Sequence, residues 1–254
     1  MLTATPWYFL PQFRPARLQD CVLWLESDSF NGGIWHNLAP NFSNLNHGTA
    51  HGGVGLSQWH PQFPPAPTFY GDDEYVEVPD DDSLDISTNE EFTFEFLFKT
   101  FSSNNQILIT HYGIDRLRCR ILGSGHLSVG FYSSESGWEW TYNESVGYND
   151  GAWHQVILVI NAGNVKFFID GTIDGEVNLT HDYTDIDSFI RIGQEYGSDT
   201  FFQGLIDELR IYKAALTHAE VVHNYTHHPL YYLQRGIDPY EVLTAATAAA
   251  APSI

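Results

Sequence analysis

The chain has 254 residues, a length that suits one all-β domain with extensions, and it is 43% hydrophobic and 15% aromatic, enough for a sizeable core. Its formal net charge of -21 disfavours a nucleic-acid backbone or an anionic membrane as partner, because both repel an acidic surface. The sequence has no long uninterrupted apolar run, so no membrane-inserted helix is predicted.

Residues 1–20 carry Pro6, Pro11 and Pro15 between aromatic side chains. Proline lacks an amide donor and disfavours both helix and central strand, so this segment is predicted to be an extended arm. The aromatic side chains need cover, which either their own domain or a neighbouring subunit can supply. The segment has no basic stretch followed by an apolar core, so we expect no secretory signal peptide here.

Residues 21–26 are predicted to form the first strand, and residues 27–68 are rich in glycine and proline and predict mostly loop. Four histidines fall in this loop-rich region, namely His36, His47, His51 and His60. No pair of them combines an i,i+4 helical or i,i+2 strand spacing with the carboxylates that are typical of a transition-metal site. No such site is therefore predicted.

The stretch from Phe69 to Thr100 contains two alternating segments that flank an acidic turn. Successive side chains of a strand point to opposite faces, so the period-2 pattern predicts half-buried strands. In the second segment one face carries Phe92, Phe94, Phe96 and Phe98, and the other carries Thr93, Glu95 and Leu97. Four phenylalanines on one face need a large apolar partner, most simply a second sheet.

Further strands are predicted at intervals typical of a β-sandwich. They cover approximately residues 106–112, 116–122, 126–132, 137–143, 153–161, 164–170, 172–179, 188–194 and 203–212. A short helix is predicted over 217–225, because Thr217 followed by Glu220 forms a capping box.

Two features of the sequence leave alternatives open. Cys21 and Cys119 either pair in an oxidising compartment or remain buried thiols. The last segment, 226–254, either starts a helix at Asp238 with Pro239 in the first helical position, or forms a flexible tail.

Four motifs in order resemble the laminin-G-like domains of the concanavalin A-like lectin/glucanase superfamily. They are the stretch 69–100, Asp150-Gly-Ala-Trp-His-Gln-Val156, Val165-Lys-Phe-Phe-Ile-Asp-Gly171 and Gly204-Leu-Ile-Asp-Glu-Leu-Arg-Ile-Tyr212. The resemblance implies an all-β, two-sheet antiparallel jelly-roll sandwich over residues 21–225. An extended arm, 1–20, would precede it, and a C-terminal helix or tail, 226–254, would follow.

The same resemblance implies a structural calcium site. Calcium takes several oxygen ligands. Family members often bind it between the N-terminal region, a Gly-Asp turn and an aspartate of the last strand. The candidates carried over are Glu26 or Asp28, then Asp72 and Asp207. The alternative is that these carboxylates only lie on the surface in turns.

Trp138, Trp140 and Tyr142 alternate along one predicted strand and therefore share a face. Aromatic rings stack on the apolar faces of sugars, so the triplet is a candidate carbohydrate-binding site. The alternative is that the triplet belongs to the core. The polar residues Glu139 and Thr141 between its members favour that alternative.

Catalysis has weaker support. Glucanases of the superfamily use a Glu-x-Asp-x-Glu strand that supplies two carboxylates about 5 Å apart. Here Glu91 and Glu95 occupy the outer positions, but Thr93 replaces the central aspartate. We expect a non-enzymatic protein.

Three functions are considered on these grounds. The first is an adhesion or assembly module on the surface of a larger particle such as a virion, where 1–20 and 226–254 contact other copies or other particle proteins. Glycan binding could accompany this role, at a virion or extracellular surface reached without a signal peptide. The second is a soluble or cell-surface lectin, and the third is a glycoside hydrolase.

Overall fold

The computed structural model describes residues 14–61, 63–112, 116–185 and 189–239. Two compact units are distinguished: residues 17–216, and the two terminal segments 1–16 and 217–254. Most of the expected N-terminal arm and of the helix predicted from Asp238 lies outside the described residues. Within the described ranges no helix is long and apolar enough to cross a membrane.

The unit 17–216 is built almost entirely of strands. In chain order they are β1 (Cys21–Asn31), β2 (Ile34–Asn37), β3 (Gly48–His51), β4 (Gly55–Ser57), β5 (Ala66–Tyr70), β6 (Tyr75–Val78), β7 (Ile86–Ser87), β8 (Glu91–Lys99), β9 (Gln106–Tyr112), β10 (Arg116–Ile121), β11 (Leu127–Ser133), β12 (Gly137–Tyr142), β13 (His154–Asn161), β14 (Asn164–Ile169), β15 (Thr172–Asn178), β16 (Thr184–Asp185), β17 (Phe189–Ile192) and β18 (Gln203–Tyr212). Among the described residues of this unit, one short 3-10 helix, Leu18–Asp20, precedes β1, and another, Asp82–Leu84, lies between β6 and β7.

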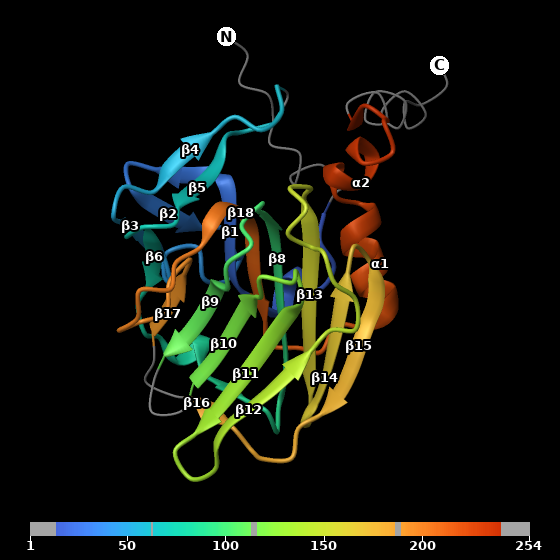
Figure 1. The fold of residues 1–254 in the computed structure, drawn as a ribbon. Helices are drawn as coiled ribbons and strands as arrows, with labels where there is room; N and C mark the ends of the chain where they lie inside the picture. Colours follow the sequence, from blue (N-terminus) through green and yellow to red (C-terminus); the bar gives the residue numbers. More distant parts are fainter. Residues whose placement is uncertain (1–13, 62, 113–115, 186–188, 240–254) are drawn as a thin grey trace. The chain divides into compact units, whose positions relative to one another are not determined.

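The strands pair antiparallel in two layers (Figure 1). One layer runs β12-β11-β10-β9-β17-β6-β3, and the other runs β1-β18-β8-β13-β14-β15. Strand β2 pairs with both β3 and β1, so one continuous path of hydrogen-bonded strands passes from the first layer to the second. The four phenylalanines of β8 share one core cluster with Val129 of β11 and Ile192 of β17. The predicted all-β jelly-roll sandwich is therefore confirmed.

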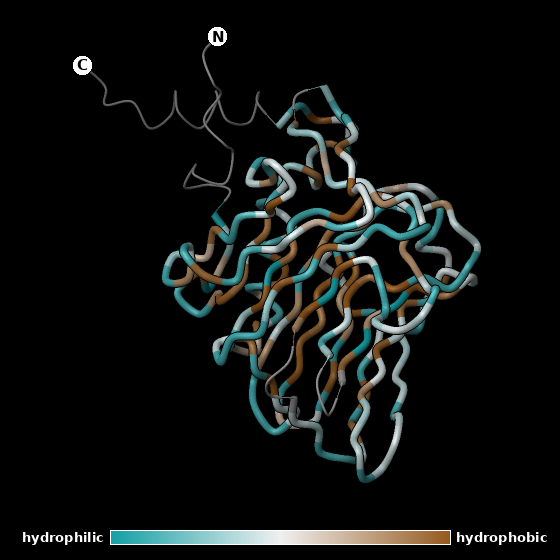
Figure 2. The backbone as a smooth tube through the Cα atoms, turned by 90° about the vertical axis from the view of Figure 1, so that its left-hand side faces the viewer, coloured by the Kyte–Doolittle hydropathy of each residue, from teal (hydrophilic) through white to brown (hydrophobic). Residues whose placement is uncertain are grey.

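The apolar core lies between these layers. In Figure 2 the hydrophobic stretches gather along the strands, and the connecting loops are mostly hydrophilic. Cys21 and Cys119 are both buried and unpaired, so the buried-thiol alternative holds. Burial raises the pKa of the Cys21 thiol to about 12 and raises that of Cys119 still further, so both are inert neutral thiols at neutral pH.

The long strands and their order match the sequence prediction closely. Short strands in the region 27–68 were missed, because β2, β3 and β4 have only three or four residues each. Such segments carry too few alternating positions for a period-2 pattern to stand out from loop.

The described part of the terminal unit contains two helices, α1 (His218–Thr226) and α2 (Pro229–Leu233). The capping box predicted for α1 is present, with Thr217 and Glu220 bonding reciprocally. The chain before the sandwich is attached to this helix, since the Ala16 amide donates to Oδ1 of Asn224 at 2.7 Å. This hydrogen bond thus joins the described parts of the two terminal segments within one unit.

Candidate functional site

A band of aromatic rings and arginines covers the outward side of the layer from β12 to β3, and we call it the aromatic–arginine face. Its members are His51, Tyr75, Tyr112, Arg118, Arg120, Tyr132, Trp138, Trp140, Tyr142, Phe189 and Arg191, with Tyr196 from the loop after β17. Each strand contributes through simple alternation. In β10, for example, Arg118 and Arg120 flank the core residue Cys119.

The strand register decides which way the tryptophans point. Val129 of β11 lies in the core and pairs with Thr141, whereas the next residue, Gly130, pairs with Trp140. Thr141 is only 2% exposed and faces inward, so Trp140 faces outward, as do the other alternate residues of β12. The alternative in which the triplet belongs to the core is therefore wrong.

The polar neighbours of the tryptophans are accommodated on the inner side by hydrogen bonds. The Thr141 hydroxyl donates to the Val129 carbonyl at 3.2 Å. The Glu139 carboxylate accepts from the amides of Thr180 at 2.8 Å and His181 at 3.2 Å. Burial raises the pKa of Glu139, but these hydrogen bonds outweigh it and leave the pKa below its ordinary value.

Trp138 and Trp140 form a column with two arginines. The indole rings are stacked, with centroids 4.9 Å apart and an interplanar angle of 18°. The guanidinium carbon of Arg118 lies 4.2 Å from the Trp138 centroid, and that of Arg120 lies 3.7 Å from the Trp140 centroid. Such contacts join an apolar ring to a cation and are stabilising when partly desolvated.

A glycine makes this packing feasible. A Cβ atom added at Gly130 would lie 2.5 Å from Cζ3 of Trp140, well inside van der Waals contact. The indole therefore lies directly over the backbone of β11. Tyr142, next along the same strand, is 44% exposed and open to a ligand.

A second aromatic group lies across β17 and β6. The guanidinium carbon of Arg191 is 4.1 Å from the Tyr75 ring and 4.7 Å from the Tyr196 ring. Arg191 also pairs with Glu77 at 2.9 Å, and Tyr75 stacks on His51 with centroids 4.6 Å apart. The face is therefore continuous across the layer.

Sequence reasoning missed the three arginines of this face. The alternation in Arg116-Leu-Arg-Cys-Arg-Ile121 is the signal that could have found those of β10, since its even positions are charged and its odd positions apolar.

The calcium candidates are only partly brought together. Asp207 Oδ1 accepts from the Ser27 amide at 2.9 Å, which places it beside Glu26. Burial, followed by the charges of Glu208 and Asp207, raises the pKa of Glu26 well above its ordinary value. Burial and Glu208 likewise raise the pKa of Asp207 to about 8. These buried carboxyl groups favour protonation over charge.

The other two candidates lie on the surface. Asp28 is exposed, and Asp72 is exposed in the turn after β5. In that turn it is Glu74 that is buried, where it accepts from the amides of Tyr70 and Gly71 at 3.0 Å each. Among the described residues no group of three or more histidine, cysteine, aspartate or glutamate side chains has a metal-holding arrangement. Calcium binding stays a prediction.

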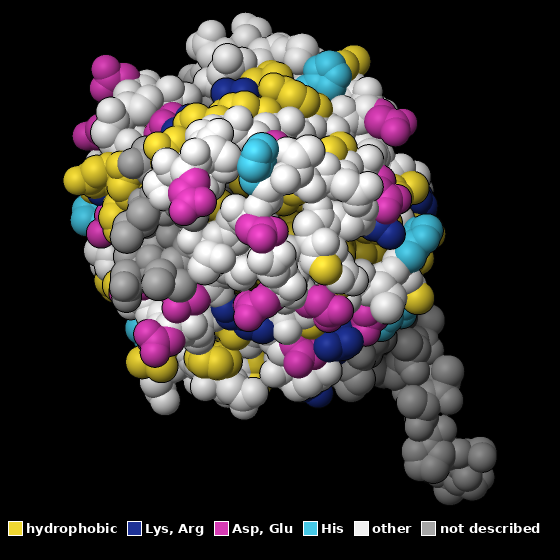
Figure 3. Space-filling model, turned by 90° about the horizontal axis from the view of Figure 1, so that it is seen from below, with side chains coloured by type: hydrophobic (Ala, Val, Ile, Leu, Met, Phe, Trp, Pro, Cys, Tyr) yellow, Lys and Arg dark blue, Asp and Glu magenta, His cyan; other side chains and the backbone are white. Residues whose placement is uncertain are grey.

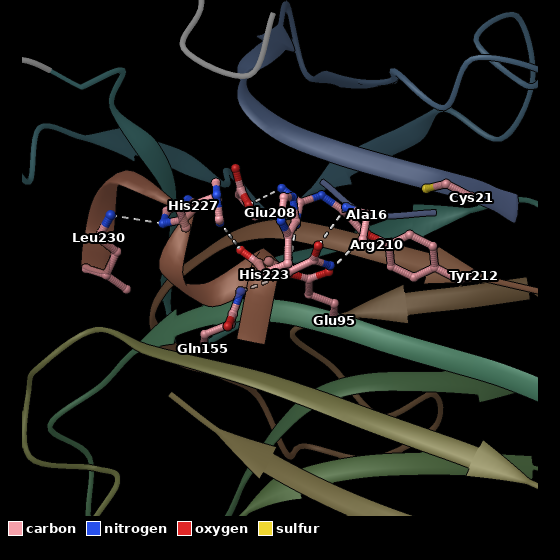
Figure 4. Close-up of polar contacts among 12 residues, drawn as sticks. Ala16, Cys21, Glu95, Gln155, Glu208, Arg210, Tyr212, His223, His227 and Leu230 are labelled. Atoms are coloured by element: carbon pink, nitrogen blue, oxygen red, sulfur yellow. Dashed lines mark hydrogen bonds and ion pairs between the residues drawn. The ribbon is translucent and has the colours of Figure 1, made fainter. Parts of the chain in front are cut away.

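A buried ionic network occupies the outer side of the second layer (Figure 4). Arg210 pairs with Glu95 at 2.8 Å and also with Glu208. Glu95 further accepts from Gln155 Nε2 at 2.8 Å and from the Tyr212 hydroxyl at 3.0 Å. The candidate catalytic carboxylate Glu95 is therefore 1% exposed and fully engaged.

Comparisons with known proteins agree with the fold. A model of the concanavalin A-like lectin/glucanases superfamily, of the laminin G type, matches residues 70–222. No curated protein matches the chain.

Solved structures with the same fold include toxin and glycosidase domains. The binding domain of Paraclostridial Mosquitocidal Protein 1 has a TM-score of 0.66 at 13% identity, over 82% of this chain and 52% of that one. A structure of botulinum neurotoxin type C, whose cell entry depends on interaction with two ganglioside molecules, has a TM-score of 0.63 at 16% identity, over 82% of this chain and 51% of that one. This chain thus spans about half the length of those toxin domains.

Domain 4 of AbnA, an extracellular arabinanase from Geobacillus stearothermophilus solved with arabinotriose, has a TM-score of 0.62 at 20% identity. The match covers 80% of this chain and 97% of that domain. At these identities the likenesses show the fold alone. The chain belongs to the laminin-G-type family of the concanavalin A-like lectin/glucanases superfamily.

Proposed function

We propose that the chain is a non-catalytic carbohydrate-binding module that holds an oligosaccharide along the aromatic–arginine face. The observation that carries the proposal is the outward column of Trp138 and Trp140, continued by the exposed ring of Tyr142. Aromatic rings beside hydrogen-bonding arginines match the alternating apolar and hydroxyl-bearing surfaces of a sugar. The arabinotriose complex of the similar arabinanase domain supports the same class of ligand.

The dimensions of the face favour a chain of sugars. From β12 to β3 the layer takes six steps between neighbouring strands. At the usual strand spacing this corresponds to about 29 Å. The tryptophan rings are largely stacked on each other and on arginines, so the ligand would contact their edges and the freer rings of Tyr142 and Tyr196, which are 44% and 46% exposed.

The non-catalytic part of the proposal rests on Glu95. A general acid or nucleophile must reach the substrate. The Glu95 carboxylate instead pairs with Arg210 and is 1% exposed, and the other glutamate of that strand, Glu91, is exposed at its beginning.

A glycan array followed by calorimetry tests the proposal. We expect wild-type protein to bind oligosaccharides, and Trp140→Ala to weaken that binding at least about tenfold, because a central interface aromatic is lost. The matched control is Phe101→Ala, since Phe101 is an aromatic side chain 77% exposed and outside the face. Silence on a broad array, or equal losses in both variants, would overturn the proposal.

Assembly on a larger particle, at a virion or extracellular surface, stays a prediction. Much of the two terminal segments on which it depends lies outside the described residues. Light scattering with calcium and then with chelator tests this role and the calcium site together. A stable oligomer supports the assembly role, and dissociation or a lower melting temperature in chelator supports bound calcium. A monomer indifferent to chelator contradicts both.

A further inference from the structure

Arg120 differs from the other arginines of the aromatic–arginine face. Its Nε is buried and has no hydrogen-bond partner among the described residues, and the side chain forms no ion pair with them. Its one described interaction is the stack on Trp140, at 3.7 Å. By contrast, Arg118 pairs with Glu195 and Arg191 pairs with Glu77. The chain has 32 acidic residues, yet none of those described forms an ion pair with this guanidinium.

A second unsatisfied polar group lies beside it. Ser128 of β11 pairs directly with Arg120 across the two strands. The Ser128 side chain is 0% exposed, and its Oγ also has no hydrogen-bond partner among the described residues. Buried polar atoms nearly always have partners in folded proteins, so two neighbouring exceptions call for an explanation. One missing acceptor placed between them would satisfy both donors.

The stacking geometry leaves the donors of Arg120 usable. A guanidinium stacks through its flat face, while its N–H groups point outward in the plane of the group. Carboxylate and sulfate oxygens accept from such a planar fork, with bonds about twice as strong as neutral ones. The neighbouring residue across the next pair of strands is Tyr142, whose exposed ring can turn to admit the group.

We infer that Arg120 and Ser128 bind the acidic group, carboxylate or sulfate, of an oligosaccharide held on the aromatic–arginine face. The inference rests on the proposed saccharide binding and names the class of saccharide. One oxygen of the acidic group accepts from Arg120 Nε and Ser128 Oγ, and the sugar ring that carries it lies against Tyr142.

The charge of the protein limits how acidic this ligand is. The net charge is -21, and Figure 3 shows acidic side chains spread over one face of the molecule with few lysines or arginines among them. This surface repels densely charged polyanions. Because Arg118 and Arg191 are already paired, Arg120 is the one open cationic position among the described side chains of the face. The ligand therefore carries isolated acidic groups on an otherwise neutral chain.

Calorimetry with matched trisaccharides tests the inference. The probes are a neutral trisaccharide, the same compound with one uronic acid residue, the methyl ester of that uronic acid, and a singly sulfated counterpart. We expect the acidic compounds to bind at least about tenfold more tightly than the neutral compound and the ester, because a charge-assisted hydrogen bond is gained. Comparing the affinities of the sulfated and the uronic acid compounds shows which of the two acidic groups the site binds more tightly.

Three variants assign the effect to residues. Arg120→Gln should abolish the preference for the acidic compounds over the neutral one, and Arg120→Lys should restore only part of that preference, because lysine lacks the planar fork. Ser128→Ala should reduce the preference by a smaller factor. Arg17→Gln is the control for losing one positive charge, since Arg17 lies outside the face and pairs with Asp20.

The outcomes distinguish failure of this inference from failure of the proposed carbohydrate binding. Binding of all four compounds with equal affinity, or a preference that survives Arg120→Gln, overturns the inference and leaves carbohydrate binding intact. Absence of binding to every saccharide overturns both. Free sulfate or acetate that binds as tightly as the acidic trisaccharide, with loss in Arg120→Gln, overturns the saccharide class and indicates a simple anion site.

Discussion

Two arginines, one on each layer of the sandwich, show two ways in which a folded chain handles a guanidinium. Arg210 of the second layer is 1% exposed and lies between Glu95 and Glu208 (Figure 4). Arg120 of the first layer is half-buried against Trp140 and has no carboxylate partner in the described structure. The charge of Arg210 is compensated when the chain folds. That of Arg120 is left for compensation from outside, which is the difference expected between a structural and a ligand-binding cation.

Removing the compensated arginine should have the largest effect. Arg210→Met leaves two buried carboxylates without their cation, and we expect a loss of about 3–5 kcal/mol in the free energy of unfolding. Chemical denaturation measures the loss. If the variant fails to fold, the triple change Arg210→Met, Glu95→Gln and Glu208→Gln should recover folded protein, because no charge then remains buried. A loss below about 1 kcal/mol in the single variant would contradict the structural role.

Disturbing the column of Trp138 and Trp140 should have a smaller effect on stability, but it should clearly weaken saccharide binding to the aromatic–arginine face. Gly130→Val places methyl groups where the Trp140 indole lies, and the ring must swing away. We expect a loss of about 1 kcal/mol, at the lower end of the range for overpacking, together with loss of saccharide binding. Gly130→Ala should give an intermediate result. Unchanged tryptophan fluorescence and binding in both variants would show that the column is not held as described.

A histidine of the second layer also has its charge compensated by carboxylates, with a smaller expected effect on stability. His154 contacts Asp170 at 2.9 Å and Asp150 at 3.2 Å. Burial lowers the pKa of His154, but the two aspartates outweigh it and raise the pKa above 6.5. Its contribution to stability is therefore complete below pH 6.5 and is lost as pH rises through the higher folded-state pKa.

Melting temperatures from about pH 5.5 to about pH 8 test this effect in wild type and His154→Gln. The stability advantage of the wild type should shrink as pH rises through that window. A constant difference between the two proteins would show that folding does not change the pKa of His154.

The smallest effect on folding is expected at the uncompensated arginine. Arg120→Met removes a partly exposed cation that has no ion pair, so the free energy of unfolding should change by no more than about 0.5 kcal/mol. A loss as large as that for Arg210→Met would place Arg120 among the structural arginines. It would remove the basis for an anionic ligand.

Much of the fold could be predicted because its long strands alternate strictly. Phe92 to Phe98 shows this pattern most clearly, and the long strands from β8 onward were found within one or two residues. Strand β1 was predicted only in part, because it runs to Asn31 and the prediction stopped at residue 26. The orientation of the strand that contains Trp138 was harder to predict. Polar Glu139 and Thr141 suggested solvent, yet hydrogen bonds to neighbouring backbone let both face inward.

The site could be predicted only in part, because its chemistry depends on strand register. Alternation places Arg120 and Trp140 on outward positions of their own strands, but their contact requires the pairing of β10, β11 and β12. The calcium candidates were taken from a motif resemblance. That resemblance carried no information about burial, which in Glu26 and Asp207 favours the protonated form.

The stacked tryptophans also give the molecule an internal optical signal. Two indoles 4.9 Å apart and nearly parallel have coupled electronic transitions, and coupled transitions produce a paired circular dichroism band. The sign and intensity of that band depend on the relative orientation of the transition moments in the two rings, whose planes lie 18° apart. A saccharide that shifts either ring would change the band directly. Binding can therefore be followed in unlabelled protein, at the position where the contact is made.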